Sequence, residues 1–75
     1  MRLILYQRDN CHLCDLALGV LAQAQVPDFA SVFVDDDARL EGRYGERVPV
    51  LCNATSGEEI ERPFDPASVA RFIAR

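Results

Sequence analysis

Two cysteines at a spacing of three, Cys11 and Cys14, are the residues of this sequence best suited to chemistry. A Cys-x-x-Cys pair can bind a metal, close a structural disulfide or carry out thiol-disulfide exchange. One histidine, His12, lies between the two cysteines, and one further cysteine, Cys52, lies far along the chain. These four side chains are therefore the ones to weigh for redox or metal chemistry.

The local sequence favours thiol chemistry at Cys11. Apolar residues on one helical face, from Leu13 to Ala24, predict a helix that begins just after Cys11 and ends before Pro27. The unpaired N–H groups and the dipole at a helix N-terminus favour an anion, so they stabilise a thiolate at Cys11. Cys14 lies one turn further along, close enough to form a disulfide with Cys11. We therefore expect Cys11 to attack a disulfide and Cys14 to resolve the mixed disulfide.

The composition is that of one small globular domain. The 75 residues leave room for a single hydrophobic core, and we expect one domain over residues 1–75. Hydrophobic residues make up 49% of the chain and charged residues 27%, a balance that is too apolar for intrinsic disorder. The net charge of -4, from 12 acidic and 8 basic residues, argues against nucleic-acid binding, which relies on clustered cations.

The apolar segments and the cysteine count indicate where the protein is found. The N-terminal apolar run, Leu3–Tyr6, is much too short for a signal-peptide core or a membrane span. We therefore expect a cytoplasmic protein without a membrane partner. We also expect a monomer. An odd number of cysteines in a reducing compartment argues against a disulfide framework and leaves catalytic or metal-binding roles for the pair.

Two strands are predicted around the helix that carries the cysteines. Leu3–Tyr6 is a continuous apolar run, as in a central strand that is covered on both faces. Ser31–Val34 is rich in β-branched and aromatic residues and predicts a second strand. A strand, a helix and a strand within about 35 residues form a βαβ unit, so we expect the two strands to be parallel.

A short helix and a hairpin are predicted next. Asp37 can cap a helix over Ala38–Tyr44, and Gly45 suits the left-handed position that ends a helix. Two extended runs, Arg47–Leu51 and Glu58–Glu61, flank a turn-forming segment and predict a β-hairpin.

A closing helix is predicted from its start signal and its apolar face. Asp65 can cap this helix, and Pro66 occupies its first position. Val69, Phe72 and Ile73 then follow at helical spacing. The predicted order is β-α-β-α-β-β-α, which is an α/β fold.

Two motifs together make the chain resemble a glutaredoxin, on a short thioredoxin-type fold. The segment Tyr6–Cys11 is similar to the family's junction between the first strand and the Cys-x-x-Cys motif. The segment Tyr44–Leu51 is similar to the family's approach to a cis-proline. The resemblance covers nearly the whole chain. It implies a minimal thioredoxin fold, in which helices flank a four-stranded mixed sheet of order 2-1-3-4 with the third strand antiparallel to the first.

The resemblance also implies an activity. Glutaredoxins are thiol-disulfide oxidoreductases, so this chain is expected to reduce protein or glutathione mixed disulfides with Cys11 and Cys14 as catalytic residues. The partner would be a disulfide-containing protein or glutathione, with glutathione as a co-substrate and no tightly bound cofactor. The segment Arg62–Asp65 stands where the family has a Gly-Gly pair and an aspartate that hold glutathione. The electron donor therefore stays open between glutathione and another thiol system.

Four residues are expected to bind the substrate on this resemblance. Pro49 would be cis and pack beside the two cysteines, and Val48 would offer its backbone to an extended peptide or to glutathione. Arg8 stands where many glutaredoxins carry a lysine that favours the thiolate; an exposed charge at a strand end is the alternative. His12 replaces the family's proline, and it either favours the thiolate or faces solvent.

Other functions stay open from the residues alone. A zinc site would need all of Cys11, His12, Cys14 and Cys52, and we expect none, because adjacent residues at a helix start point in different directions. An iron-sulfur cluster shared between two chains, with two thiols from each, is a further alternative. So is a redox-inert interaction module with buried thiols. Cys52 is expected to be a buried core residue.

Overall fold

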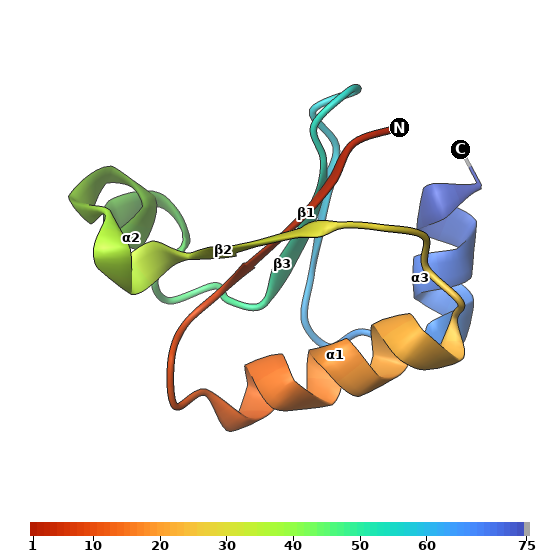
Figure 1. The fold of residues 1–75 in the computed structure, drawn as a ribbon, viewed down its shortest axis with the longest axis horizontal. Helices are drawn as coiled ribbons and strands as arrows, with labels where there is room; N and C mark the ends of the chain where they lie inside the picture. Colours follow the sequence, from red (N-terminus) through yellow and green to blue (C-terminus); the bar gives the residue numbers. More distant parts are fainter. Residues whose placement is uncertain (75) are drawn as a thin grey trace.

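The structure is a computed structural model that describes residues 1–74. It consists of a four-stranded sheet with flanking helices (Figure 1). The last residue of the expected domain, Arg75, lies outside the described residues. In chain order the elements are β1 (Leu3–Gln7), α1 (His12–Gln23), β2 (Ala30–Phe33), the 3₁₀ turn η1 (Val34–Asp36), α2 (Ala38–Tyr44), β3 (Val50–Asn53), β4 (Glu59–Glu61) and α3 (Pro66–Ile73). The predicted order of strands and helices is confirmed, with η1 in addition. Within residues 1–74, no helix is long and apolar enough to cross a membrane.

The sheet has the strand order β2-β1-β3-β4. β1 is parallel to β2, as expected for a βαβ unit, and antiparallel to β3. β3 and β4 form the predicted antiparallel hairpin, although β3 begins at Val50 and not at Arg47 as predicted. The order and the orientations are those of a minimal thioredoxin fold, so the fold that the resemblance implies is confirmed.

α1 and α3 pack against one face of the sheet (Figure 1). Side chains alternate between the two faces of a strand, and Leu5 of β1 lies directly opposite Leu51 of β3 on this face. The buried core here combines side chains from β1, β3, α1 and α3, namely Leu3, Leu5, Leu51, Leu21, Val69 and Phe72. This core holds α1 against the sheet, and with it the cysteine pair at the start of the helix.

A second buried cluster joins α2 to the other face of the sheet. Tyr6 and Val50 are directly opposite each other in the register and share that face. Tyr44, at the end of α2, stacks on Tyr6 and packs with Val50. The same cluster contains Cys14 and Val48, so it supports the candidate site directly.

The ends of α2 test the predicted capping residues. Asp37 is the N-cap, as predicted, and its side chain accepts two backbone N–H groups of the helix. The prediction of a left-handed Gly45 is wrong, because its φ of -52° and ψ of -39° are right-handed helical. A Cβ atom on Gly45 would collide with the backbone carbonyl and the carboxylate of Glu41. Glycine is therefore favoured here by the close approach of Glu41 and not by a special backbone conformation.

α1 exposes part of the apolar face that the sequence predicts. Ala17 and Leu21 are buried, whereas Leu13 is 46% exposed and Leu16 is 54% exposed. The predicted helix is confirmed, but only part of its apolar face is buried. The sheet and α3 cover only one side of the helix, and Leu13 and Leu16 lie beyond the covered side.

Candidate active site

A tight turn between β1 and α1 presents Cys11. Asn10 has a left-handed φ of 56°, a conformation that asparagine tolerates better than most residues. The chain is extended again at Cys11, which is the N-cap of α1. The Cys11 Sγ accepts a hydrogen bond from the backbone N–H of Cys14 at 3.2 Å. The helix N-terminus therefore favours negative charge on the Cys11 sulfur.

The two thiols of the pair have different environments. Both are free, and Cys11 is partly exposed whereas Cys14 is 1% exposed. Burial, followed by the hydrogen bond with Cys11, raises the pKa of the Cys14 thiol to about 11. Cys14 therefore keeps its proton at neutral pH, and Cys11 is the sulfur that another molecule can reach. Side chains three positions apart on a helix are neighbours, so the pair can form a disulfide.

The Val48-Pro49 segment lies beside the two cysteines. Val48 belongs to the same buried cluster as Cys14, and Cys11 packs against that cluster. The Val48-Pro49 peptide bond is cis, which is the isomer that the resemblance implies, and Pro49 is fully buried. The fold thus brings Val48 and Pro49 to the cysteine pair, and the backbone of Arg8 also forms a hydrogen bond with the Cys14 thiol.

Both backbone groups of Val48 have partners within the chain. Its N–H donates to the Tyr44 carbonyl at 2.9 Å. Its carbonyl accepts a hydrogen bond from the Arg62 guanidinium, which also donates to the Glu46 carbonyl at 3.3 Å. A substrate backbone at Val48 would compete with the Arg62 side chain, and substrate binding by Val48 stays a prediction.

Arg8 ties the end of β1 to the end of α2. Its guanidinium forms an ion pair with Glu41 and donates to the Gly45 carbonyl at 2.9 Å. These contacts hold the turn that carries Cys11 against α2. His12 is the first residue of α1 and is exposed, which agrees with the solvent-facing alternative. For both Arg8 and His12, a role in substrate binding stays a prediction.

A cluster of aromatic and charged side chains holds the segment before the cis-proline from the α2 side. The Tyr44 ring stacks on Tyr6 with the ring centroids 4.2 Å apart, and its hydroxyl donates to Glu59 at 2.5 Å. Arg47 forms ion pairs with Glu59 and Glu61 at 3.0 Å each. Burial would raise the pKa of Glu59, but the hydrogen bonds from Tyr44 and Arg47 outweigh it and lower the pKa. We refer to these five residues as the α2-side cluster.

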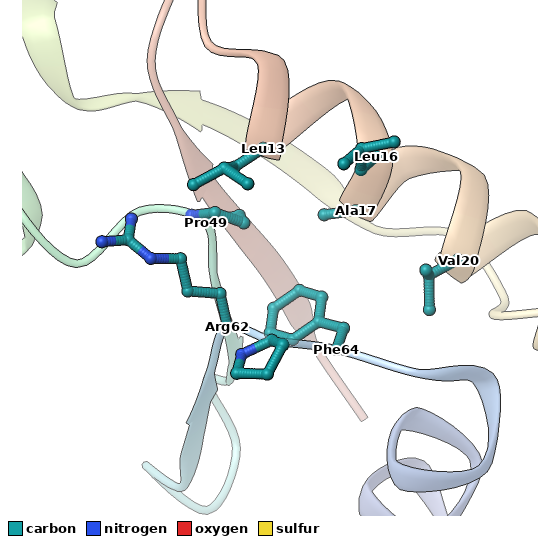
Figure 2. A pocket seen from close by; sticks show the side chains of 8 residues that line it. Leu13, Leu16, Ala17, Val20, Pro49, Arg62 and Phe64 are labelled. Carbon is teal, nitrogen blue, oxygen red and sulfur yellow. The ribbon is translucent and has the colours of Figure 1, made fainter.

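An apolar pocket of about 110 Å³ opens on the α1 side of Pro49 (Figure 2). Its lining comes from α1, from the residue before β3 and from the segment after β4: Leu13, Leu16, Ala17, Val20, Pro49, Arg62, Pro63 and Phe64. In Figure 2, Leu13 and Val20 project from α1 on the side that faces Pro49 and Phe64. This pocket was not predicted from the sequence. The sequence held one signal of an exposed apolar surface. The apolar residues of α1 cover a wider part of the helix circumference than one buried face requires.

The described residues do not form a metal site. Within residues 1–74, no group of three or more His, Cys, Asp or Glu side chains could hold an ion. Cys52 lies opposite Ile4 in the sheet, on the face that α2 covers, and is buried as expected. Burial also raises the pKa of its thiol. The four-ligand set considered from the sequence is therefore not assembled within one chain.

Comparison with known proteins identifies the family. The chain matches the model of the glutaredoxin-like domain (DUF836) over residues 2–74. It belongs to this glutaredoxin-like family. The X-ray structure of target protein XcR50 from X. campestris is similar, with 53% sequence identity, a TM-score of 0.91 and coverage of 96% of this chain and 95% of that chain. The solution structure of XcR50 also has 53% identity, with a TM-score of 0.89 and coverage of 99% and 94%. No curated protein sequence matches the chain.

Membership of the glutaredoxin-like family confirms the resemblance found in the sequence. The family, the thioredoxin fold and the adjacent thiols of Cys11 and Cys14 together indicate a redox-type function. The arrangement of the glutaredoxin-like site suits such a function, because a partly exposed sulfur lies at a helix N-terminus next to a buried one.

Proposed function

We propose that this glutaredoxin-like protein is a thiol-disulfide oxidoreductase that reduces protein or glutathione mixed disulfides. One observation supports the proposal most: Cys11 is partly exposed at the start of α1, whereas Cys14 is buried one turn away and keeps its proton. This difference suits one sulfur to attack and the other to act afterwards. Cys11 is the nucleophile, and Cys14 is the resolving thiol.

The proposed reaction consists of two exchange steps. In the first, the Cys11 thiolate attacks one sulfur of the substrate disulfide, that S–S bond breaks, and the leaving thiolate takes up a proton. In the second, Cys14 gives up its proton and attacks the Cys11 Sγ. This step releases the second substrate thiol and leaves a Cys11-Cys14 disulfide, so two electrons have passed to the substrate. Two molecules of a small thiol such as glutathione then restore the dithiol and leave as a disulfide.

The surrounding residues have supporting roles in this proposal. The cis Val48-Pro49 segment packs beside the thiols and bounds the approach to Cys11. Arg8 interacts electrostatically with Cys11 and holds the preceding turn. His12 contacts the bound substrate from the exposed start of α1. The protein works as a cytoplasmic monomer on a disulfide-containing protein or on glutathione.

The first test is equilibration of the chain in glutathione buffers of defined potential. After quenching by alkylation, peptide mass spectrometry measures the thiol states of Cys11 and Cys14. We expect reversible oxidation of the pair with a midpoint of about -200 to -230 mV, the range of glutaredoxins. A far lower midpoint would favour another thiol system over glutathione as the donor. Absence of the disulfide at every potential would overturn the proposal.

The alternative functions give different results with the same protein. In an oxidoreductase, an alkylating reagent at neutral pH labels one cysteine fast, whereas a redox-inert module has three unreactive thiols. An iron-sulfur cluster shared between two chains would give colour and a dimer after anaerobic reconstitution. Cys52→Ala is the matched control for these measurements, because Cys52 lies on the face of the sheet that α2 covers.

A further inference from the structure

The apolar pocket lies beside the first turns of α1, the helix whose N-cap is Cys11. Leu13 follows Cys11 by two positions and lines the pocket together with Pro49, which directly follows Val48 of the buried cluster that contains Cys14. Leu13 and Leu16 are large apolar side chains on adjacent turns, and both are largely exposed. Exposed apolar residues that gather around one pocket, unlike single ones, mark an interaction site.

Both backbone groups of Val48, next to this pocket, already have a hydrogen-bond partner within the chain. The N–H of Val48 donates to Tyr44, and its carbonyl accepts from Arg62. A peptide that pairs with the Val48 N–H must displace the Tyr44 carbonyl, and one that pairs with the Val48 carbonyl must share it with Arg62. Contacts through side chains need no such exchange of hydrogen bonds, and a pocket of about 110 Å³ with apolar walls is large enough for one aliphatic side chain.

Arg62 adds a positive charge to the rim of the pocket. Its guanidinium donates to two backbone carbonyls and takes part in none of the ion pairs within residues 1–74. Arg8 and Arg47, by contrast, are paired with glutamates. Arg62 is also the one charged side chain among the described residues that line the pocket. A planar guanidinium without a carboxylate partner is suited to bind one from another molecule.

We infer that this pocket selects protein disulfides in which an apolar side chain and a carboxylate lie close to the reacting cysteine. The inference rests on the proposed function and deepens it by naming the substrate class. The apolar side chain of the substrate binds between Leu13 and Phe64. The substrate carboxylate accepts the hydrogen bonds that Arg62 otherwise donates to two backbone carbonyls. Movement of Arg62 onto the carboxylate frees the Val48 carbonyl to accept an N–H of the substrate.

The chemistry stays the two-step exchange. The substrate disulfide is the oxidant and the Cys11-Cys14 dithiol is the reductant, so a single turnover needs no further reagent. Binding in the pocket acts on the first step, because it holds the substrate disulfide close to the Cys11 sulfur in a productive orientation.

The test measures single-turnover rate constants of the reduced protein with short capped peptides whose one cysteine is a mixed disulfide with 2-mercaptoethanol. The reference peptide has a leucine and an aspartate within two residues of the cysteine. Alanine in place of leucine should lower the rate constant about tenfold. Asparagine in place of aspartate should lower it about threefold, since the ion pair is exposed. Only this second effect should vanish at about 1 M salt, where exposed charges are screened.

Variants of the protein assign these effects to the pocket. Leu13→Ser should abolish the preference for leucine, and Arg62→Gln should abolish the preference for aspartate. Leu18→Ser and Arg71→Gln are the matched controls, because both residues are exposed and neither lines the pocket. Both controls should keep both preferences.

Reduction of bis(2-hydroxyethyl) disulfide separates this inference from the proposed function. If the protein reduces this small disulfide through Cys11 but treats all the peptides alike, the pocket inference is overturned and the proposed function stands. If it reduces neither the small disulfide nor the peptides, the proposed function itself fails. Preferences that persist in both Leu13→Ser and Arg62→Gln would also overturn the inference.

Discussion

The two sides of the segment around Pro49 differ in their chemistry. On the α2 side, Tyr44, Arg47 and Glu59 form a network of ring contacts, ion pairs and hydrogen bonds. On the α1 side, Leu13 and other apolar side chains border an open pocket. The side chains of the α2 side bind one another and hold the segment in place, whereas the α1 side offers unpaired apolar surface to another molecule.

The difference shows how a chain of 75 residues can keep a reactive site ordered. A site keeps its geometry when the residues around it are locked by packing and hydrogen bonds on rigid elements. The α2-side cluster supplies that support, so the α1 side can leave apolar groups exposed. Substitutions on the α2 side should therefore lower stability, and substitutions near Cys11 should change reactivity at nearly constant stability.

The largest effect expected is on the reactive side. Cys11→Ser should lower the rate of disulfide reduction by about a thousandfold or more, because the attacking sulfur is lost. Its unfolding in urea should stay close to that of the unchanged protein, since Cys11 is partly exposed. Cys14→Ser should instead trap the mixed disulfide, which mass spectrometry detects. Full turnover by Cys11→Ser would contradict both the role of Cys11 and the division between the two sides.

The α2 side should respond in the opposite way. Tyr44 is 3% exposed, and its ring is stacked on Tyr6, so Tyr44→Ala should lower the free energy of unfolding by about 3 to 5 kcal/mol. Tyr44→Phe keeps the ring and loses only the hydrogen bond to Glu59, which should cost about 1 to 3 kcal/mol. Urea unfolding of the three proteins measures both values. Equal stability of Tyr44→Ala and the unchanged protein would contradict the claim that the α2-side cluster stabilises the fold.

The pH dependence of the second exchange step tests the burial of Cys14. Its pKa of about 11 means that little thiolate is present at neutral pH. The rate at which Cys14 resolves a preformed mixed disulfide on Cys11 should rise about tenfold per pH unit between about pH 6 and pH 9, because the thiolate fraction rises by that factor below the pKa. Burial, the largest cause of the raised pKa, persists in the mixed disulfide. Stopped-flow release of the substrate thiol measures the rate, and a flat profile would show that Cys14 is already ionised.

The elements of the fold could be predicted because their signals are local. Asp37 and Asp65 cap helices through backbone groups within a few positions, and the apolar run at β1 needs no distant partner to be recognised as a strand. The arrangement of the sheet is not a local property. Its order came from the family resemblance, through Cys11 and Pro49, and the structure confirms it.

The contacts of the site could not be predicted, because they join residues that are distant in the sequence. Arg62 reaches the Val48 carbonyl only because β3 and β4 pair as a hairpin in one particular register. Arg8 meets Glu41 only because α2 packs next to the end of β1. Helical periodicity placed Leu13 on the same face as buried residues, whereas the position of the sheet and α3 decides which of them are covered.

The smallest effect expected concerns the charge of Glu59. Its pKa is lowered from 4.5 in the fold, so the ionised group contributes stability above about pH 4.5, and this contribution is lost as the pH falls through the folded pKa. Glu59→Gln should therefore lower the free energy of unfolding by about 1 kcal/mol at neutral pH, and by less at about pH 3. Glu46→Gln, at an exposed position, should have no such pH-dependent effect. A loss in Glu59→Gln that is the same at both pH values would mean that hydrogen-bond geometry, and not charge, holds the α2 side together.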